Sequence, residues 1–215
     1  MNSEQLLAYS IKYEGDYASI QRAIHQNEPY HPVKDKGFYF TLCDDIYPDS
    51  LKVLKNPPFV LYYRGNLNLL QSECVSVIGS RNALPYASKW TEIVVKELSK
   101  NYVIVSGLAK GIDGLAHEVA LEYGSTIAIL GCGIDVIYPI CNKDLYHKIM
   151  KNGLILSEYP GKTEVHKHQF VMRNRIIAGL GQSLFVMQSN LKSGSMITVN
   201  VALDCGKDVT WLRFN

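Results

Sequence analysis

The fold of the chain is best predicted from the stretch Val75-Ser-Val-Ile-Gly-Ser-Arg81, a short apolar run that ends in glycine, serine and arginine. Five similar apolar runs follow, at residues 102–105, 126–130, 154–156, 183–187 and 208–212. Helix-compatible stretches separate them, the clearest at residues 86–100, 113–123, 143–151, 173–180 and 195–205. Continuous apolar strands that alternate with helices are typical of a parallel sheet covered on both faces. We therefore predict an α/β protein with an extended Rossmann-like, doubly wound, mostly parallel sheet.

The first 50 residues have a different pattern. Residues 3–10 and 17–25 are compatible with short helices, and Pro29, Pro32 and Gly37 interrupt the pattern after them. An apolar and aromatic run at residues 59–63 then predicts a strand. We expect a small helical appendage over residues 1–50 and the Rossmann-like domain over residues 51–215.

Composition limits the classes of function. The chain has 215 residues with a formal net charge of +2, so any site for a polyanion must be a local patch. Its first residues do not form the basic segment followed by an apolar stretch that is typical of a signal peptide. No apolar run approaches the ~20 residues of a membrane span. The five cysteines have no metal-ligand spacing, which favours reduced thiols. We expect a cytoplasmic protein with no membrane association and no bound metal.

Glycine and serine follow most of the predicted strands. The segments at residues 79–81, 106–111, 131–133 and 193–195 all contain glycine, and ligands of open α/β sheets bind at these strand ends. Glycine lets backbone amides approach a phosphate, and serine adds a hydrogen bond. Neither the third glycine of a dinucleotide fingerprint nor a P-loop motif is present. The pattern therefore predicts a phosphate-bearing ligand and no nucleotide cofactor.

Positive charge is concentrated at the same predicted edge. Arg81 and Lys110 follow the first two strands, and residues 161–175 contain four lysines and arginines against the single acid Glu164. Phe170 lies among them, either as a stacking ring or as a core residue. Cationic groups that track a backbone, together with a ring that stacks a base, are typical of sites for single-stranded nucleic acid.

Ordered motifs along residues 45–207 carry a resemblance to a known family. They are Tyr47-Pro48, Leu61-Tyr-Tyr-Arg-Gly65, Gly79-Ser-Arg81, Val105-Ser-Gly-Leu-Ala-Lys-Gly-Ile-Asp113, Ala116-His117, Gly133-Ile-Asp-Val-Ile-Tyr-Pro139, Ser157-Glu-Tyr-Pro160, Phe170-Val-Met-Arg-Asn-Arg175 and Ser193-Gly-Ser195 with Ile197-Thr198. In these motifs the chain resembles the DNA-processing protein A (DprA/Smf) family of bacterial recombination mediators.

The resemblance implies a non-catalytic protein that binds single-stranded DNA in a basic pocket. It also implies homodimers and a role in natural transformation, in which incoming single-stranded DNA is protected and handed to the RecA recombinase. The first 50 residues resemble a reduced form of the helical, SAM-like domain of some members. Family members usually continue past the last strand, and many add a winged helix, whereas this chain ends at Asn215. Dimer or RecA surfaces that such an extension would build are therefore not assumed for this sequence.

The DNA-binding residues that we predict combine the strand ends, the basic segment and the family motifs. They are Gly79, Ser80, Arg81, Gly107, Lys110, Lys167, Phe170, Arg173, Asn174, Arg175, Ser193, Gly194 and Ser195.

Enzymatic alternatives rest on weaker patterns. Asp113 and His117 are four residues apart on one helix face, but we interpret Asp113 as a helix-start carboxylate and His117 as a hydrogen-bonded core residue. Phosphoribohydrolases, which hydrolyse nucleotides on a similar fold, carry a glutamate signature that is missing at Ser193–Thr198. Release of free base from nucleoside monophosphates would favour that alternative. A protein-interaction scaffold would instead show no affinity for oligonucleotides.

Overall fold

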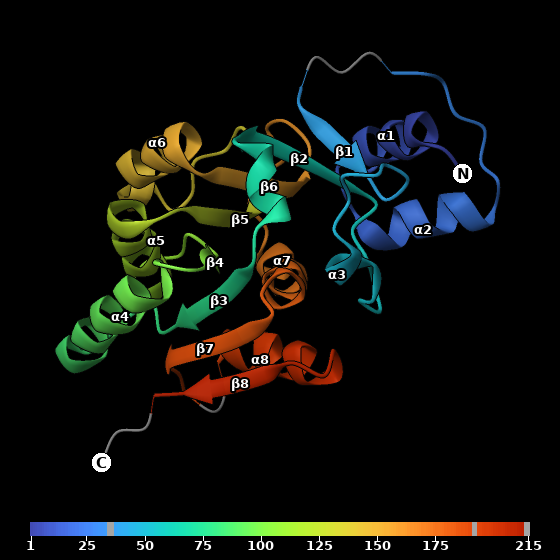
Figure 1. The fold of residues 1–215 in the computed structure, drawn as a ribbon. Coiled ribbons are helices and arrows are strands. Elements are labelled where there is room, and N and C mark those ends of the chain that lie inside the picture. The colour runs from blue at the N-terminus through green and yellow to red at the C-terminus, as the bar shows by residue number, and fades with distance from the viewer. Residues whose placement is uncertain (34–36, 191–192, 213–215) are drawn as a thin grey trace.

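The computed structural model of the chain describes residues 1–33, 37–190 and 193–212, and these ranges contain one eight-stranded sheet with helices on both faces (Figure 1). The strands are β1 (Tyr39–Thr41), β2 (Val60–Gly65), β3 (Cys74–Gly79), β4 (Val103–Ser106), β5 (Thr126–Gly133), β6 (Leu154–Tyr159), β7 (Ser183–Gln188) and β8 (Asp208–Trp211). The helices are α1 (Ser3–Lys12), α2 (Tyr17–His25), α3 (Asp49–Lys52), α4 (Pro85–Leu98), α5 (Ile112–Tyr123), α6 (Lys143–Asn152), α7 (Lys167–Leu180) and α8 (Gly194–Asp204).

The order of the strands confirms the predicted doubly wound architecture. They are arranged as β1-β2-β6-β5-β4-β3-β7-β8. The last six strands in this order, β6-β5-β4-β3-β7-β8, are parallel. Only the β1–β2 and β2–β6 pairs are antiparallel among the described strands. From β3 the chain moves outward through β4, β5 and β6, and it then returns to β7 on the other side of β3. The topological switch point, where such folds bind ligands, therefore lies between the carboxyl ends of β3 and β7.

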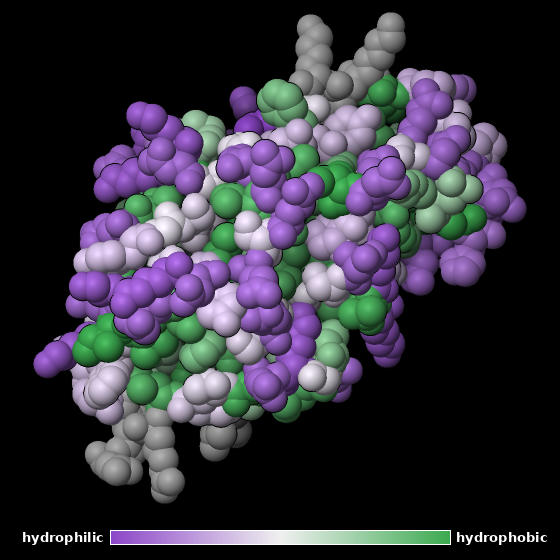
Figure 2. Space-filling model, viewed as in Figure 1, coloured by the Kyte–Doolittle hydropathy of each residue, from purple (hydrophilic) through white to green (hydrophobic). Residues whose placement is uncertain are grey.

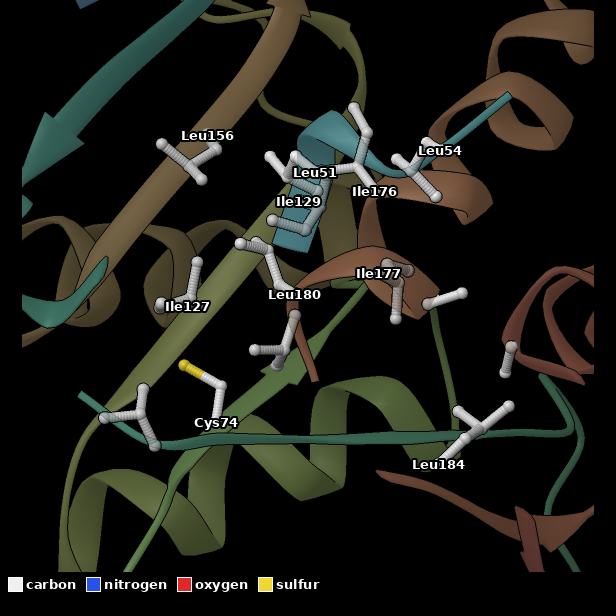
Figure 3. Packing of buried hydrophobic residues seen from close by; sticks show 14 of the residues in the cluster. Leu51, Leu54, Cys74, Ile127, Ile129, Leu156, Ile176, Ile177, Leu180 and Leu184 are labelled. Carbon is white, nitrogen blue, oxygen red and sulfur yellow. The ribbon is translucent and has the colours of Figure 1, made fainter. Parts of the chain in front are cut away.

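The apolar runs become strands because both of their faces are buried. In β5, Ile127 and Ile129 pack toward α7, where they meet Ile176 and Ile177 (Figure 3). The intervening Ala128 and Leu130 join a cluster on the opposite face with α6. In Figure 1, α4, α5 and α6 cover one face of the sheet, and α7 and α8 cover the other. A strand buried on both faces has no alternation of polar and apolar residues, which explains why the sequence shows continuous runs.

The outer surface is mixed in character. Figure 2 shows hydrophilic side chains over much of the visible face, with apolar residues between them. Within residues 1–33, 37–190 and 193–212, no helix has both the length and the apolar character needed to cross a membrane.

The N-terminal segment contributes to the sheet as well as to the helices. The two helices predicted at residues 3–10 and 17–25 are present as α1 and α2. Leu6, Leu7 and Tyr9 of α1 belong to the same buried cluster as Tyr62 of β2. Strand β1 pairs with β2, so the sheet already begins at Tyr39, before the boundary that we expected at residue 50. This three-residue strand is too short to give a periodic signal in the sequence.

Helix α7 begins six residues earlier than the sequence indicated. It starts at Lys167, whereas the sequence predicted a helix only from residue 173. The backbone amide of His166 donates to Oε1 of Gln169 at 2.7 Å, which is half of a capping box. Histidine is not among the usual N-cap residues, so this helix start was missed. Arg173 therefore lies inside the helix and not at its start.

Candidate nucleic-acid interface

A cavity of about 700 Å³ opens at the switch point between β3 and β7. We call it the switch-point cavity. Most of the predicted DNA-binding residues line it: Gly79, Ser80, Arg81, Lys167, Phe170, Arg173, Asn174, Ser193, Gly194 and Ser195. Three of them, Gly107, Lys110 and Arg175, are not among its lining residues. The cavity thus combines the loop after β3, the first turns of α7 and the start of α8.

One face of helix α7 forms a wall of the cavity. Lys167, Phe170, Arg173 and Asn174 all line it, and so does Ile177. These residues are three or four positions apart, which places them on the same side of an α-helix. Arg175 follows Arg173 by two positions and consequently points to a different side of the helix.

Arg81 provides positive charge at the exposed rim of the cavity. Its side chain is exposed, and its guanidinium carbon lies 5.7 Å from the ring centroid of Phe170. The backbone of the following loop is held in place, because Leu84 N donates to Oε1 of Gln188 at the end of β7 at 2.9 Å. The cation is therefore presented beside an aromatic ring by a loop tied to both strands of the switch point.

Phe170 is half-buried in the wall and is not a fully buried core residue. A Cβ atom at Gly131 would lie 2.6 Å from its ring, so glycine at the end of β5 lets the phenyl group pack directly on the strand backbone. The guanidinium carbon of Arg173 lies 5.9 Å from the ring centroid. Phe170 is thus held rigidly, with part of its ring toward the cavity.

Arg173 is a buried arginine whose Nη1 and Nε already donate hydrogen bonds within the protein. It is 4% exposed, and it donates to the carbonyl oxygens of Gly107, at 2.6 Å, and Ile129. Its Nε also donates to Oδ1 of Asn174 at 3.2 Å. Burial lowers the pKa of Arg173, and the neighbouring carboxylate of Asp113 opposes that shift. Arg173 therefore ties the ends of β4 and β5 to α7 and places a fixed positive charge beneath the cavity.

Asp113 lies beside the backbone amides that we expected to bind phosphate. Its carboxylate, at the start of α5, is close enough to the amides of Gly79, Gly107 and Ala109 for them to influence its pKa. Burial raises the pKa of this carboxyl group, while Arg173 and the three amides lower it. The position predicted for Asp113, in the first helical turn next to unpaired amides, is confirmed. A carboxylate therefore lies beside the amides of Gly79 and Gly107.

The close approach of Asp113 and Arg173 requires glycine at position 107. A Cβ atom there would lie 2.6 Å from both Nη1 of Arg173 and Oδ2 of Asp113. Of the described residues that line the cavity, Asp113 alone carries a carboxylate. Within the described ranges, no group of three or more His, Cys, Asp or Glu side chains could hold a metal ion.

His117 is a structural residue, as the sequence predicted. Its Nε2 accepts from the amide of Leu108 at 3.2 Å, and its Nδ1 lies 2.6 Å from Oγ1 of Thr126. Because the Thr126 hydroxyl donates to the carbonyl of Ile104, it must accept from Nδ1–H of the histidine. Burial lowers the pKa of His117 to about 3. The neutral imidazole therefore fixes the β4–α5 loop, which borders the cavity through Ala109.

Replacing His117 with glutamine is expected to change the pH dependence of stability. An unfolded histidine has a pKa of about 6.5, so below that pH the unfolded wild type binds a proton that the folded state excludes down to about pH 3. Wild-type stability should therefore fall, relative to the variant, by close to 1.4 kcal/mol per pH unit between about pH 6 and 4. Urea unfolding of both proteins across this range measures the difference. A constant difference would contradict the buried, neutral state of His117.

Arg175 and Lys110 lie away from the cavity lining. Arg175 donates to Oε1 of Glu158 at 2.6 Å and to the carbonyl of Asn56 at 2.7 Å, and both charged side chains are less than 9% exposed. Burial is the largest single influence on the pKa of Arg175 and lowers it, but the charge and hydrogen bond of Glu158, with smaller contributions from Tyr159 and Tyr47, together raise it, so the net direction is upward. Lys110 is exposed on the β4–α5 loop. We leave Arg175 out of the proposed contacts because its guanidinium is committed to Glu158.

Sequence reasoning missed Tyr138 as a lining residue. It lies between β5 and α6 and is 42% exposed, with its ring centroid 5.5 Å from that of Phe170. The available signal was its place in the motif Gly133–Pro139, directly after a predicted strand. Exposure of a tyrosine at such a position cannot be inferred from a single sequence.

Comparison with known proteins places the chain in a family. The family model described as DNA recombination-mediator protein A matches residues 38–215. The DNA processing protein DprA of Streptococcus pneumoniae is 45% identical over 171 residues, which cover 79% of this chain and 61% of that protein. The Bacillus subtilis DprA is 40% identical over 166 residues, covering 76% of this chain and 56% of its own length. The chain thus spans about three fifths of the length of these relatives.

Two solved structures are similar in fold and in sequence. The X-ray structure of DprA from S. pneumoniae superposes with a TM-score of 0.83 at 35% identity, over 99% of this chain and 83% of the other. DNA processing protein A from Helicobacter pylori, whose structure was described for its unique single-stranded DNA binding mode, gives a TM-score of 0.77 at 37% identity, over 85% and 84% of the two chains. The chain therefore belongs to the DNA recombination-mediator protein A (DprA/Smf) family.

Proposed function

We propose that the chain binds single-stranded DNA in the switch-point cavity and that it acts by binding, without catalysing a reaction. The observation that carries this proposal is the position of Arg81 beside the half-buried ring of Phe170, at the edge of the sheet where doubly wound folds take their ligands. A cation next to a half-buried ring that lines the cavity matches the two components of single-stranded DNA, a phosphate and an unpaired base.

Each lining residue has a distinct part in the proposed complex. Arg81 and Lys167 contact phosphates, and Lys110 extends the positive surface beyond the cavity. The small polar residues Ser80, Ser193 and Ser195 donate hydrogen bonds to phosphate oxygens. Phe170 stacks one base. Arg173 acts through its charge and through the strand ends that it ties together, because its Nη1 already donates to backbone carbonyl oxygens and its Nε to Asn174.

The cellular role is proposed from the family. The H. pylori relative is described as binding single-stranded DNA, which supports the same ligand for this chain. We further propose that the protein is a recombination mediator in natural transformation, where it protects incoming single strands and helps to load the recombinase RecA, and that it is a cytoplasmic homodimer. The match to the recombination-mediator family model supports this role.

The ionic-strength dependence of binding tests the proposed function. Anisotropy of a labelled oligo(dT) should show an affinity that falls linearly on a log–log plot against salt, with a slope of about −0.7 for each phosphate contacted. Contacts from Arg81, Lys167 and Lys110 predict a total slope near −2. A duplex of the same length should bind more weakly, because its bases are not available to Phe170. Absence of oligonucleotide binding, or release of free base from nucleoside monophosphates, would contradict the proposal.

A further inference from the structure

We infer that Tyr138 is a second base-stacking residue, which takes the base adjacent to the one on Phe170. This inference rests on the proposed function and adds to it a binding residue and a minimum footprint of two nucleotides. It starts from a tyrosine that is 42% exposed at the lining of the switch-point cavity. Its ring centroid lies 5.5 Å from that of Phe170.

The loop that carries Tyr138 is anchored at both ends. Before Tyr138, the carboxylate of Asp135 accepts from Nη2 of Arg64 at 2.7 Å, and the amide of Asp135 donates to the carbonyl of Gly161 at 2.9 Å. After Tyr138, the side-chain amide of Asn142 donates to the carbonyl of Leu108 at 3.0 Å. These contacts hold the loop against β2, against the segment between β6 and α7, and against the β4–α5 loop. A ring held in this way loses little conformational freedom when a base stacks on it.

The geometry of the two rings determines how bases could stack. Aromatic rings in direct contact have centroids about 4.5–7 Å apart, so two rings with a base between them must be farther apart than such a pair. The centroids of Tyr138 and Phe170 are only 5.5 Å apart, and the rings are inclined by 44°. They therefore form two adjoining stacking faces and not a clamp. Two successive bases, splayed apart, each find one face.

The surrounding charges fit a strand that crosses both rings. The guanidinium carbon of Arg81 lies 5.7 Å from the Phe170 ring, where it meets the phosphate that accompanies the stacked base. Lys167 lines the same cavity one helical turn before Phe170. An unpaired base adds a stacking partner for each ring, whereas a small anion such as free phosphate would use only the cations.

Two substitutions at Tyr138 separate stacking from other roles. Tyr138→Ala should weaken oligo(dT) binding roughly 5- to 150-fold, the range that one stacked base contributes. Tyr138→Phe should bind within about twofold of the wild type, since it keeps the aromatic face. Tyr123→Ala, which removes a tyrosine of α5 that is 45% exposed and does not line the cavity, is the matched control and should leave binding unchanged. Thermal unfolding of each variant checks that the fold is kept.

A fluorescent base analogue gives a readout that a purely structural role would not change. An oligo(dT) with a single 2-aminopurine should be quenched by wild-type protein, and part of this quenching should disappear in Tyr138→Ala while Phe170→Ala removes another part. Wild-type affinity and quenching in Tyr138→Ala, beside a weakened Phe170→Ala, would overturn the inference and leave the proposed function intact. Equal weakening in Tyr138→Ala and Tyr138→Phe would also overturn it, because the hydroxyl group would then be the contact. Absence of binding by the wild type would overturn the proposed function and this inference together.

Discussion

Replacing Arg175 with methionine should lower the free energy of unfolding by about 3–5 kcal/mol, the largest effect on stability that we expect from a single substitution. The change leaves the carboxylate of Glu158 buried without its partner, since the exposed fractions of the two side chains are 8% for Arg175 and 4% for Glu158. Oε2 of Glu158 already has no hydrogen-bond partner among the described residues. The ring of Tyr17, 5.5 Å from the guanidinium carbon, would also lose its cation.

Urea unfolding at neutral pH measures this effect. A surface pair provides the comparison, because Lys100 and Glu97 are 2.7 Å apart but 54% and 71% exposed. Lys100→Met should therefore cost no more than about 1 kcal/mol. The double variant Arg175→Met with Glu158→Leu should recover much of the loss, because it removes both buried charges. If Arg175→Met were as mild as Lys100→Met, the buried pair would not have the role assigned to it.

Charge reversal at Arg81 should weaken binding of single-stranded DNA by on the order of 100-fold at moderate salt. The substitution Arg81→Glu removes one phosphate contact and places a carboxylate at the rim of the cavity, where it repels the strand. The salt slope should become shallower by about 0.7. Stability should be little affected, because Arg81 is exposed and its main contact is with the ring of Phe170.

A matched control distinguishes local from overall electrostatics. Arg22 is exposed on α2 and does not line the cavity. Arg22→Glu and Arg81→Glu both change the formal net charge from +2 to 0, since each replaces one positive charge with one negative charge. Only Arg81→Glu should weaken anisotropy-detected binding strongly. Equal losses in the two variants would indicate general attraction to the protein surface and no defined site at Arg81.

Much of the fold could be predicted because its strands are buried on both faces. The continuous apolar runs marked every parallel strand, and the predicted start of α5 at residue 113 lies one residue from its observed start at Ile112. Strand β1 was missed because its stability comes from pairing with β2, about twenty residues later in the chain. The start of α7 was missed because His166 and Gln169 form its N-terminal cap, and histidine is not one of the residues that commonly mark a helix start.

The helical spacing of Arg173 and Arg175 decides which of them lines the cavity. Two positions apart on a helix, they point to different sides. Arg175 meets Glu158 on its own side of α7, and Arg173 meets the carbonyl of Gly107 on the other. The strand-end location of Arg81 followed from the sequence alone. The position of the Asp113 carboxylate beside the Gly79 amide did not, because it depends on the packing of distant segments.

Photocrosslinking locates the DNA most directly. Iododeoxyuridine in a single-stranded oligonucleotide crosslinks to nearby aromatic side chains, and mass spectrometry identifies the peptide. The chain offers internal controls, since Trp90 is 39% exposed and Tyr123 is 45% exposed, and neither lines the switch-point cavity. Binding in the cavity predicts crosslinks to the peptides that contain Phe170 and Tyr138, and their loss in Arg81→Glu. Crosslinks confined to Trp90 or Tyr123 would show that DNA binds elsewhere and would contradict the account.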